Sequence, residues 1–138
     1  MKRKLFWWIL TIVGLLVLTS LACGGSGSSF KKTPELDLTT NYLQDQRDTA
    51  YQYRDVFENM AQGRFNDAPD RLLALGKEVR GLHPPSSYRD VHTKYVQATY
   101  CFDGAAHALE SGDMASALQH LQDGNKHIDE ATILMNSK

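Results

Sequence analysis

Apolar residues recur every three or four positions along most of the chain, which is the spacing of one face of an α-helix. The first stripe runs from Pro34 to Met60, with Thr33 as an expected N-cap and Pro34 in the first helical position. Gly63 follows the stripe and is expected to end the helix. The stripe comprises Leu36, Thr39, Leu43, Gln46, Ala50, Tyr53, Phe57 and Met60.

Three further stripes follow the first. We expect a second helix over about residues 66–82, stopped by Pro84 and Pro85. A third is expected to start at Ser87, which forms a capping-box-like pair with Asp90 three residues later, and to end before Gly112. The fourth is expected over about residues 114–135.

Four helical stripes joined by short connections predict antiparallel neighbours that cross at about 20°. Strand-like alternation competes with this pattern nowhere in the region. The predicted fold is therefore all-α, with residues 34–138 forming one up-down-up-down four-helix bundle. Helices of this length depend on burial of their apolar faces, so packing between the two predicted hairpins is expected to supply most of the stability.

The start of the chain has a different pattern. Three basic residues at positions 2–4 precede an apolar run over residues 5–22, interrupted only by Thr11, Gly14, Thr19 and Ser20 and followed by Cys23. The sequence Thr-Ser-Leu-Ala-Cys at the end of this run resembles the lipobox cleaved by bacterial lipoprotein signal peptidase. The resemblance implies a signal peptide over residues 1–22 and an acylated Cys23 at the mature N-terminus. Ser20 stands where that family usually has Leu, so a retained transmembrane anchor and simple secretion stay open as alternatives.

Residues 23–33 follow as a Gly/Ser-rich tether. Random-coil scaling gives about nine such residues a reach of roughly 16 Å, which would hold the bundle near the bilayer. Two or more acyl chains are needed for a durable anchor. We therefore expect the protein on the cell membrane, lipid-anchored, on its extracytoplasmic side. Lys31 and Lys32 either approach anionic headgroups or form an ordinary solvated pair.

The charge of the chain argues against one class of partner, and its cysteine content limits disulfide formation. Without residues 1–22 the chain keeps 12 basic and all 16 acidic residues, a formal charge of −4. A nucleic-acid partner is disfavoured, because such binding needs a basic footprint. With Cys23 acylated, Cys101 is left alone and cannot form an internal disulfide. We read Cys101 as a small, half-buried apolar residue.

A row of potential metal ligands is the sharpest candidate for chemistry. His120, Asp123, His127 and Glu130 follow one another at spacings of three and four, which places neighbours within reach of a metal. The register of the apolar stripe, however, predicts that all four face away from the core, whereas metal sites in bundles project inward. We therefore expect no metal here and interpret the row as a solvated face.

Asp103 and His107 repeat the same spacing on the third predicted helix. The stripe register predicts that these two also lie on the surface.

Two polar residues, Gln46 and Asn125, fall on the predicted inner stripes. Inward polar groups need hydrogen-bond partners. Either they form a small network that fixes the helix register, or they line a polar cavity for a ligand.

One segment resembles small helical domains of bacterial exported lipoproteins of unknown function. It contains Leu82-His83-Pro84-Pro85, followed by Tyr88, Val91, His92 and Tyr95 and by the stretch from Leu109 to Leu121. The resemblance brings no catalytic residue and no cofactor.

Two classes of function stay open. We expect a non-enzymatic, membrane-anchored lipoprotein whose bundle binds another envelope protein or acts as an accessory module, since no nucleophile motif, phosphate loop or dinucleotide fingerprint occurs. The alternative is a lipoprotein that binds a small molecule or metal, through the polar cavity near Gln46 and Asn125 or through the row that begins at His120.

Overall fold

The computed structural model describes residues 34–138, with side chains from Leu38 onward. The predicted signal segment 1–22, the acylated Cys23 and the tether to residue 33 lie outside the described residues.

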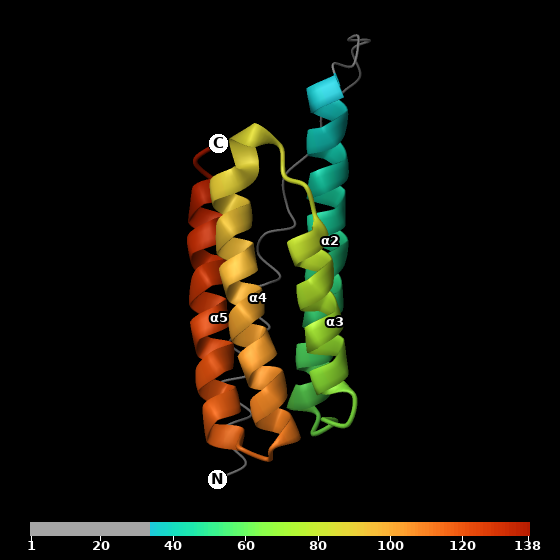
Figure 1. Ribbon diagram of the computed structural model, residues 1–138, viewed down its shortest axis with the longest axis vertical. Helices are drawn as coiled ribbons and strands as arrows, with labels where there is room; N and C mark the ends of the chain where they lie inside the picture. The colour runs from blue at the N-terminus through green and yellow to red at the C-terminus, as the bar shows by residue number, and fades with distance from the viewer. Residues whose placement is uncertain (1–33) are drawn as a thin grey trace.

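Four α-helices make up most of the described chain (Figure 1). They are α2 (Pro34–Ala61), α3 (Ala68–Gly81), α4 (Arg89–Glu110) and α5 (Met114–Met135), with a 3-10 turn η2 (Ser86–Tyr88) before α4. No strand occurs within residues 34–138, so the predicted all-helical class is confirmed.

Successive helices run in opposite directions (Figure 1). α4 and α5 approach each other along the greatest length, followed by α3 with α4 and then α2 with α3. The arrangement agrees with the predicted alternation of helices in a bundle. Within residues 34–138, none of the helices combines the length and apolarity that a bilayer crossing requires.

Glycines end two of the helices. Gly63 follows α2 with φ +79° and Gly112 follows α4 with φ +76°, both in the left-handed region that glycine adopts at little cost. Asp113 then caps α5, because its carboxylate accepts the Ser116 N–H at 3.0 Å and the Ser116 hydroxyl at 2.6 Å. The predicted end at Gly63 and the turn at Gly112 are confirmed.

The predicted start of the third helix was wrong. Residues from Ser86 form a 3-10 turn, α4 begins at Arg89, and no side-chain hydrogen bond caps it. Asp90 does not complete a capping box with Ser87. Its carboxylate accepts the Val91 N–H at 2.9 Å and pairs with Lys138 at 2.8 Å, so it ties the start of α4 to the end of the chain.

An aromatic cluster occupies the centre of the core. Phe102 of α4 is 2% exposed, and its ring centroid lies 5.1 Å from that of Tyr53 and 5.4 Å from that of Phe57, both on α2. The core cluster that surrounds these rings also includes Val56, Met60, Ala68, Leu72, Leu75, Val79, Ala98, Ala105, Ala106 and Leu121.

Small residues allow α4 and α5 to approach closely. The buried residues of α5 are Ala117, Leu121, Gly124 and Ala131. A Cβ added at Gly124 would lie 2.4 Å from Cε1 of Phe102, closer than real Cβ atoms come to a carbon. Gly124 therefore makes the space that the Phe102 ring fills.

Candidate functional site

The first residue of the predicted metal row faces α4. A Cβ at Gly104 would lie 3.0 Å from both Cε1 and Nδ1 of His120, so the imidazole lies against the glycine backbone. The expectation that His120 points away from the core was wrong. The stripe register could not reveal this, because a glycine on the facing helix opens space for a side chain at the edge of the apolar stripe.

The other three residues of the row have different surroundings. Asp123 is exposed and accepts hydrogen bonds from Gln119. Glu130 is half-buried and pairs with Lys94 of α4 at 2.7 Å, with His127 Nδ1 3.4 Å away. The ammonium of Lys94 lowers the pKa of Glu130, and His127 adds to this effect. His120 and Glu130 therefore face α4, contrary to expectation, whereas the predicted surface position of Asp123 is confirmed.

No group of three or more His, Cys, Asp or Glu side chains within residues 34–138 is arranged to hold a metal ion.

Gln46 points inward as predicted. It is 8% exposed, and its Nε2 donates to the Tyr42 hydroxyl at 3.4 Å. Asn125 is only half-buried, and it lies on α5, whereas Gln46 and Tyr42 lie on α2. The inward position is thus confirmed for Gln46 and incomplete for Asn125.

Gln46 belongs to an aromatic and histidine cluster where α2 meets the start of α4. The Tyr42 hydroxyl and His92 Nδ1 share a hydrogen bond of 3.3 Å, and their rings meet edge to face at 5.7 Å. The ring of Tyr88 lies 6.0 Å from that of Tyr42. Burial raises the pKa of Tyr42, and Tyr95 nearby raises it further. Burial lowers the pKa of His92, as does the neighbouring His83, so the neutral imidazole is favoured.

A pocket of about 330 Å³ opens beside this cluster. The first turns of α2 form one wall and the end of α3 forms the other. Its lining residues are Leu38, Asn41, Tyr42, Asp45, Gly81, Leu82 and His83. The lining combines the Tyr42 ring and two leucines with several polar groups.

A second polar cluster lies between α3 and α4, and the sequence analysis missed it. Arg80 Nη1 lies 2.9 Å from Asp103 Oδ2 and donates to Thr99 Oγ1 at 2.9 Å. The side chains of Arg80 and Asp103 are only 25% and 18% exposed. Asp103, which we expected on the surface, therefore faces the neighbouring helix.

Gly76 creates the room for this ion pair. A Cβ at Gly76 would lie 2.7 Å from Asp103 Oδ1 and 2.9 Å from Arg80 Nη1. The signal was present in the sequence as a glycine in a helix interior, four residues before an arginine. It pointed to a close approach without naming the group that approaches.

Two buried oxygens near this pair take no hydrogen bond within the described chain. They are the Tyr53 hydroxyl and Asp103 Oδ1. Burial raises the pKa of Tyr53, and the Asp103 carboxylate raises it further, while Arg80 opposes them. The Tyr53 hydroxyl therefore stays protonated beside the ion pair.

Cys101 is half-buried on α4, as expected. Burial raises the pKa of its thiol, and Asp123 adds to the effect. Both keep the sulfur protonated, which is the opposite of what a nucleophilic cysteine needs.

No family model matches the chain, and searches of the curated proteins and of the solved structures find no match either. The chemistry of the candidate sites therefore has to be argued from their geometry.

Proposed function

We propose that this protein is a bacterial lipoprotein, held on the extracytoplasmic side of the membrane by acyl chains on Cys23. Its bundle is a non-enzymatic module that binds another protein of the cell envelope. The basic start, the apolar run over residues 5–22 and the small residue before Cys23 support the anchor. The Gly/Ser-rich stretch that follows suits a tether better than the continuation of a helix.

One observation carries the binding role. Tyr100 of α4 is 62% exposed, and the guanidinium carbon of Arg80 lies 5.0 Å from the centroid of its ring. Tyrosine and arginine are enriched at the centres of protein interfaces, where large rigid side chains contribute most of the affinity. Burial raises the pKa of the Cys101 thiol, so this cysteine does not suggest a nucleophilic enzyme.

The anchor is tested by the intact mass of the chain purified from membranes. We expect a polypeptide that begins at Cys23 and carries diacylglycerol, and a Cys23→Ser variant that keeps residues 1–22 and gains no lipid. A native chain that retains Met1 without fatty acid would contradict the anchor. The binding role is tested by crosslinking in intact cells followed by purification, with a Tyr100→Ala variant as the matched comparison. Recovery of the same neighbours from both would contradict a role for this face.

Small-molecule binding is a second candidate, favoured by the pocket beside Tyr42 and Gln46. Native mass spectrometry of the full-length chain, released gently from membranes, would detect a co-purifying molecule. We expect a Leu38→Trp variant, which fills the pocket, to lose that molecule. Metal analysis without chelator tests the row that begins at His120, and a stoichiometry near zero would remove it.

A further inference from the structure

Arg80 uses only one edge of its guanidinium within the bundle. Nη1 makes both of its bonds, one to Asp103 and one to Thr99. Nη2 lies 3.4 Å from the position that a Cβ at Gly76 would take, and neither Nε nor Nη2 is among the fully buried atoms that lack a partner. The Arg80 side chain is 25% exposed, so part of it is open to solvent and can meet a partner. Two parallel donors such as those of Nε and Nη2 match the two oxygens of a carboxylate.

The side chain of Arg80 is already ordered before any partner arrives. Asp103 and Thr99 hold Nη1, Gly76 leaves room for the guanidinium, and the Tyr100 ring lies along it at 5.0 Å. A flexible arginine loses rotamer freedom when it binds, and an arginine fixed in advance loses less. Binding at the Nε and Nη2 edge is favoured for that reason.

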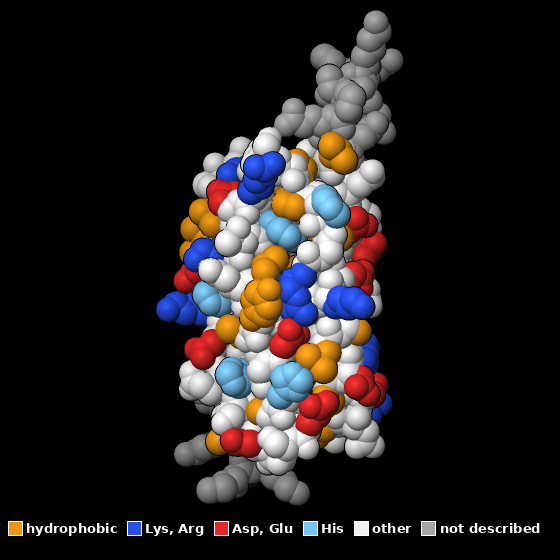
Figure 2. All heavy atoms as spheres, viewed as in Figure 1, with side chains coloured by type: hydrophobic (Ala, Val, Ile, Leu, Met, Phe, Trp, Pro, Cys, Tyr) orange, Lys and Arg blue, Asp and Glu red, His pale blue; other side chains and the backbone are white. Residues whose placement is uncertain are grey.

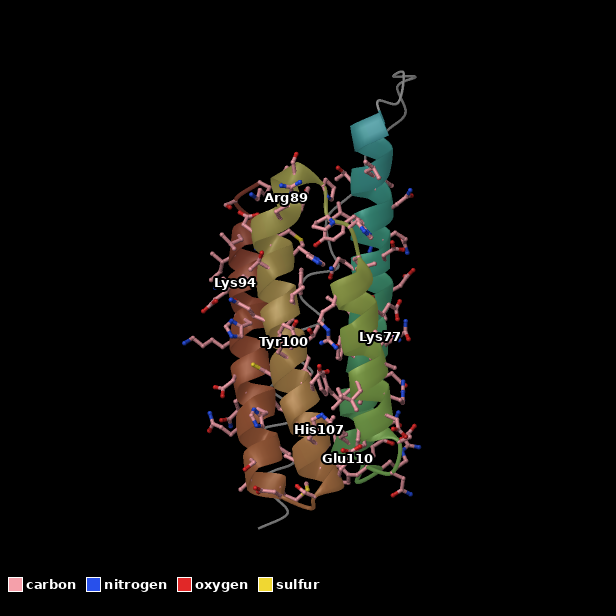
Figure 3. All side chains as sticks on the ribbon, viewed as in Figure 1. Lys77, Arg89, Lys94, Tyr100, His107 and Glu110 are labelled. Atoms are coloured by element: carbon pink, nitrogen blue, oxygen red, sulfur yellow. The ribbon has the colours of Figure 1, made fainter. Side chains whose placement is uncertain are left out.

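The surroundings of this edge combine an aromatic wall with a second cation. Figure 3 shows Tyr100 of α4 and Lys77 of α3 on the same face of the molecule. On that face a patch of hydrophobic side chains over the middle of α4 lies directly beside Lys and Arg side chains (Figure 2). Lys77 is exposed and precedes Arg80 by three residues on the same helix, so the two share one side of α3.

We propose that the face of α3 and α4 centred on Arg80 and Tyr100 docks an acidic segment of a partner protein. A carboxylate of that segment takes the Nε and Nη2 edge of Arg80, an apolar neighbour packs on Tyr100, and a second carboxylate pairs with Lys77. This assignment rests on the proposed function, and it names the chemistry of the partner. Asp103 offsets part of the charge of Arg80, so the segment is recognised by the geometry of the donors together with Lys77.

The position of the face favours a protein over the membrane surface. Tyr100 lies 11 residues into α4, which is about 16 Å along the helix from Arg89. The start of α4 lies at the same end of the bundle as the start of α2, where the predicted tether joins (Figure 1). The face therefore lies on the side of the bundle, away from the end that the predicted tether joins. A neighbouring protein reaches this position more easily than a lipid headgroup does.

The test titrates the full-length chain in detergent micelles with a synthetic peptide of four glutamates around one tryptophan. A matched peptide with glutamines in place of the glutamates is the ligand control. We expect the acidic peptide to bind by calorimetry, and the affinity to fall as salt is added. Arg80→Lys keeps the positive charge but loses the paired N–H donors of the guanidinium, and Tyr100→Ala removes the aromatic ring. Each is expected to weaken binding about tenfold.

Arg47→Lys is the control variant, because Arg47 is exposed on α2 rather than on this face. Its affinity should stay within about twofold of the native value. Tyr100→Ala changes an exposed side chain, so it decides the outcome should Arg80→Lys unfold in circular dichroism.

The proposal is overturned if both peptides bind equally, or if Tyr100→Ala binds the acidic peptide as the native chain does. It is also overturned if phosphatidylglycerol vesicles displace the peptide and themselves depend on Arg80, because the face would then be a lipid site. A chain without an acyl group on Cys23 that still binds the peptide would remove the anchor and keep this surface. An acylated chain that does not bind the peptide would support the anchor and contradict the docking face.

Discussion

α2 and α5 lie at opposite ends of the described helix order and bury opposite kinds of side chain. The buried residues of α2 include Tyr53, Phe57 and Met60, whereas those of α5 are small apart from Leu121. Small residues let the backbones of α4 and α5 approach, and large residues fill the wider space on the α2 side. Phe102 of α4 contacts both regions, because its ring packs edge-on or tilted against the α2 aromatics and lies over Gly124 of α5.

Removal of the shared ring should have the largest effect. Phe102→Ala leaves a cavity between the α2 aromatics and α5, and we expect a loss of about 4 kcal/mol in the free energy of unfolding. Urea denaturation followed by circular dichroism measures it. Ile133→Ala is the control, since Ile133 is 69% exposed, and it should change stability by less than about 0.5 kcal/mol. Equal losses in the two variants would contradict the central place of Phe102.

A methyl group on the α5 side should have the next largest effect. Gly124→Ala improves helix propensity by about 1 kcal/mol, but its Cβ collides with the Phe102 ring. We expect a net loss of about 1–2 kcal/mol. Gly81→Ala, where no atom lies within 4 Å of the new Cβ, should be neutral or slightly stabilising.

The collision also predicts a coupling between the two positions. Phe102→Leu should make Gly124→Ala less harmful than it is in the native chain, which a double-mutant cycle measures. Strict additivity would show that the ring and the glycine act independently.

The α2 side and the α4 side of the bundle also differ in their ion pairs with α3. Arg80 pairs with Asp103 of α4 in a partly buried setting, whereas Arg71 pairs with Asp55 of α2 where the Asp55 side chain is 60% exposed. Asp103→Ala leaves Arg80 without its partner, and we expect a loss of about 1–2 kcal/mol. Asp55→Ala should cost less than about 0.5 kcal/mol. Thermal unfolding of both variants at low and high salt checks the contrast, and a larger effect at Asp55 would reverse it.

The contact of α2 with the start of α4 should depend on pH, with the smallest effect. The pKa of His92 is lowered in the folded chain, so the unfolded chain binds its proton more readily. The stability from neutral His92 is present above the unfolded value of about 6.5 and is lost as the pH falls through the folded pKa. His92→Gln should flatten the fall of stability on acidification, measured by denaturation from pH 7 to pH 4. An unchanged pH profile would show that His92 is not the group responsible.

The helices themselves could be predicted well. The apolar stripes, Gly63 and Gly112 place the helices and two of the turns, because these features act through a few neighbouring residues. The start of α4 could not be predicted, since Asp90 pairs with Lys138 at the end of the chain and forms no capping box with Ser87. The inward position of Gln46 followed from its stripe, while its partner Tyr42 lies outside the predicted stripe.

The candidate sites were less accessible to sequence reasoning. Asp103 and His120 both lie at the edge of an apolar stripe, and each turns toward a neighbouring helix because a glycine there makes room. An apolar stripe assigns a residue to a face of its own helix, but it does not show which residues of the neighbouring helix lie opposite that face.

The sequence by itself determined the helical class, the approximate helix limits and the pattern that predicts an anchor at Cys23, because periodicity, turn residues and signal-like segments are local properties. Only the tertiary structure decided that Arg80 meets Asp103, that Phe102 fills the space over Gly124 and that Tyr100 stands exposed beside a guanidinium. These depend on the rotation of one helix against another. That rotation is selected by the packing of all four helices together.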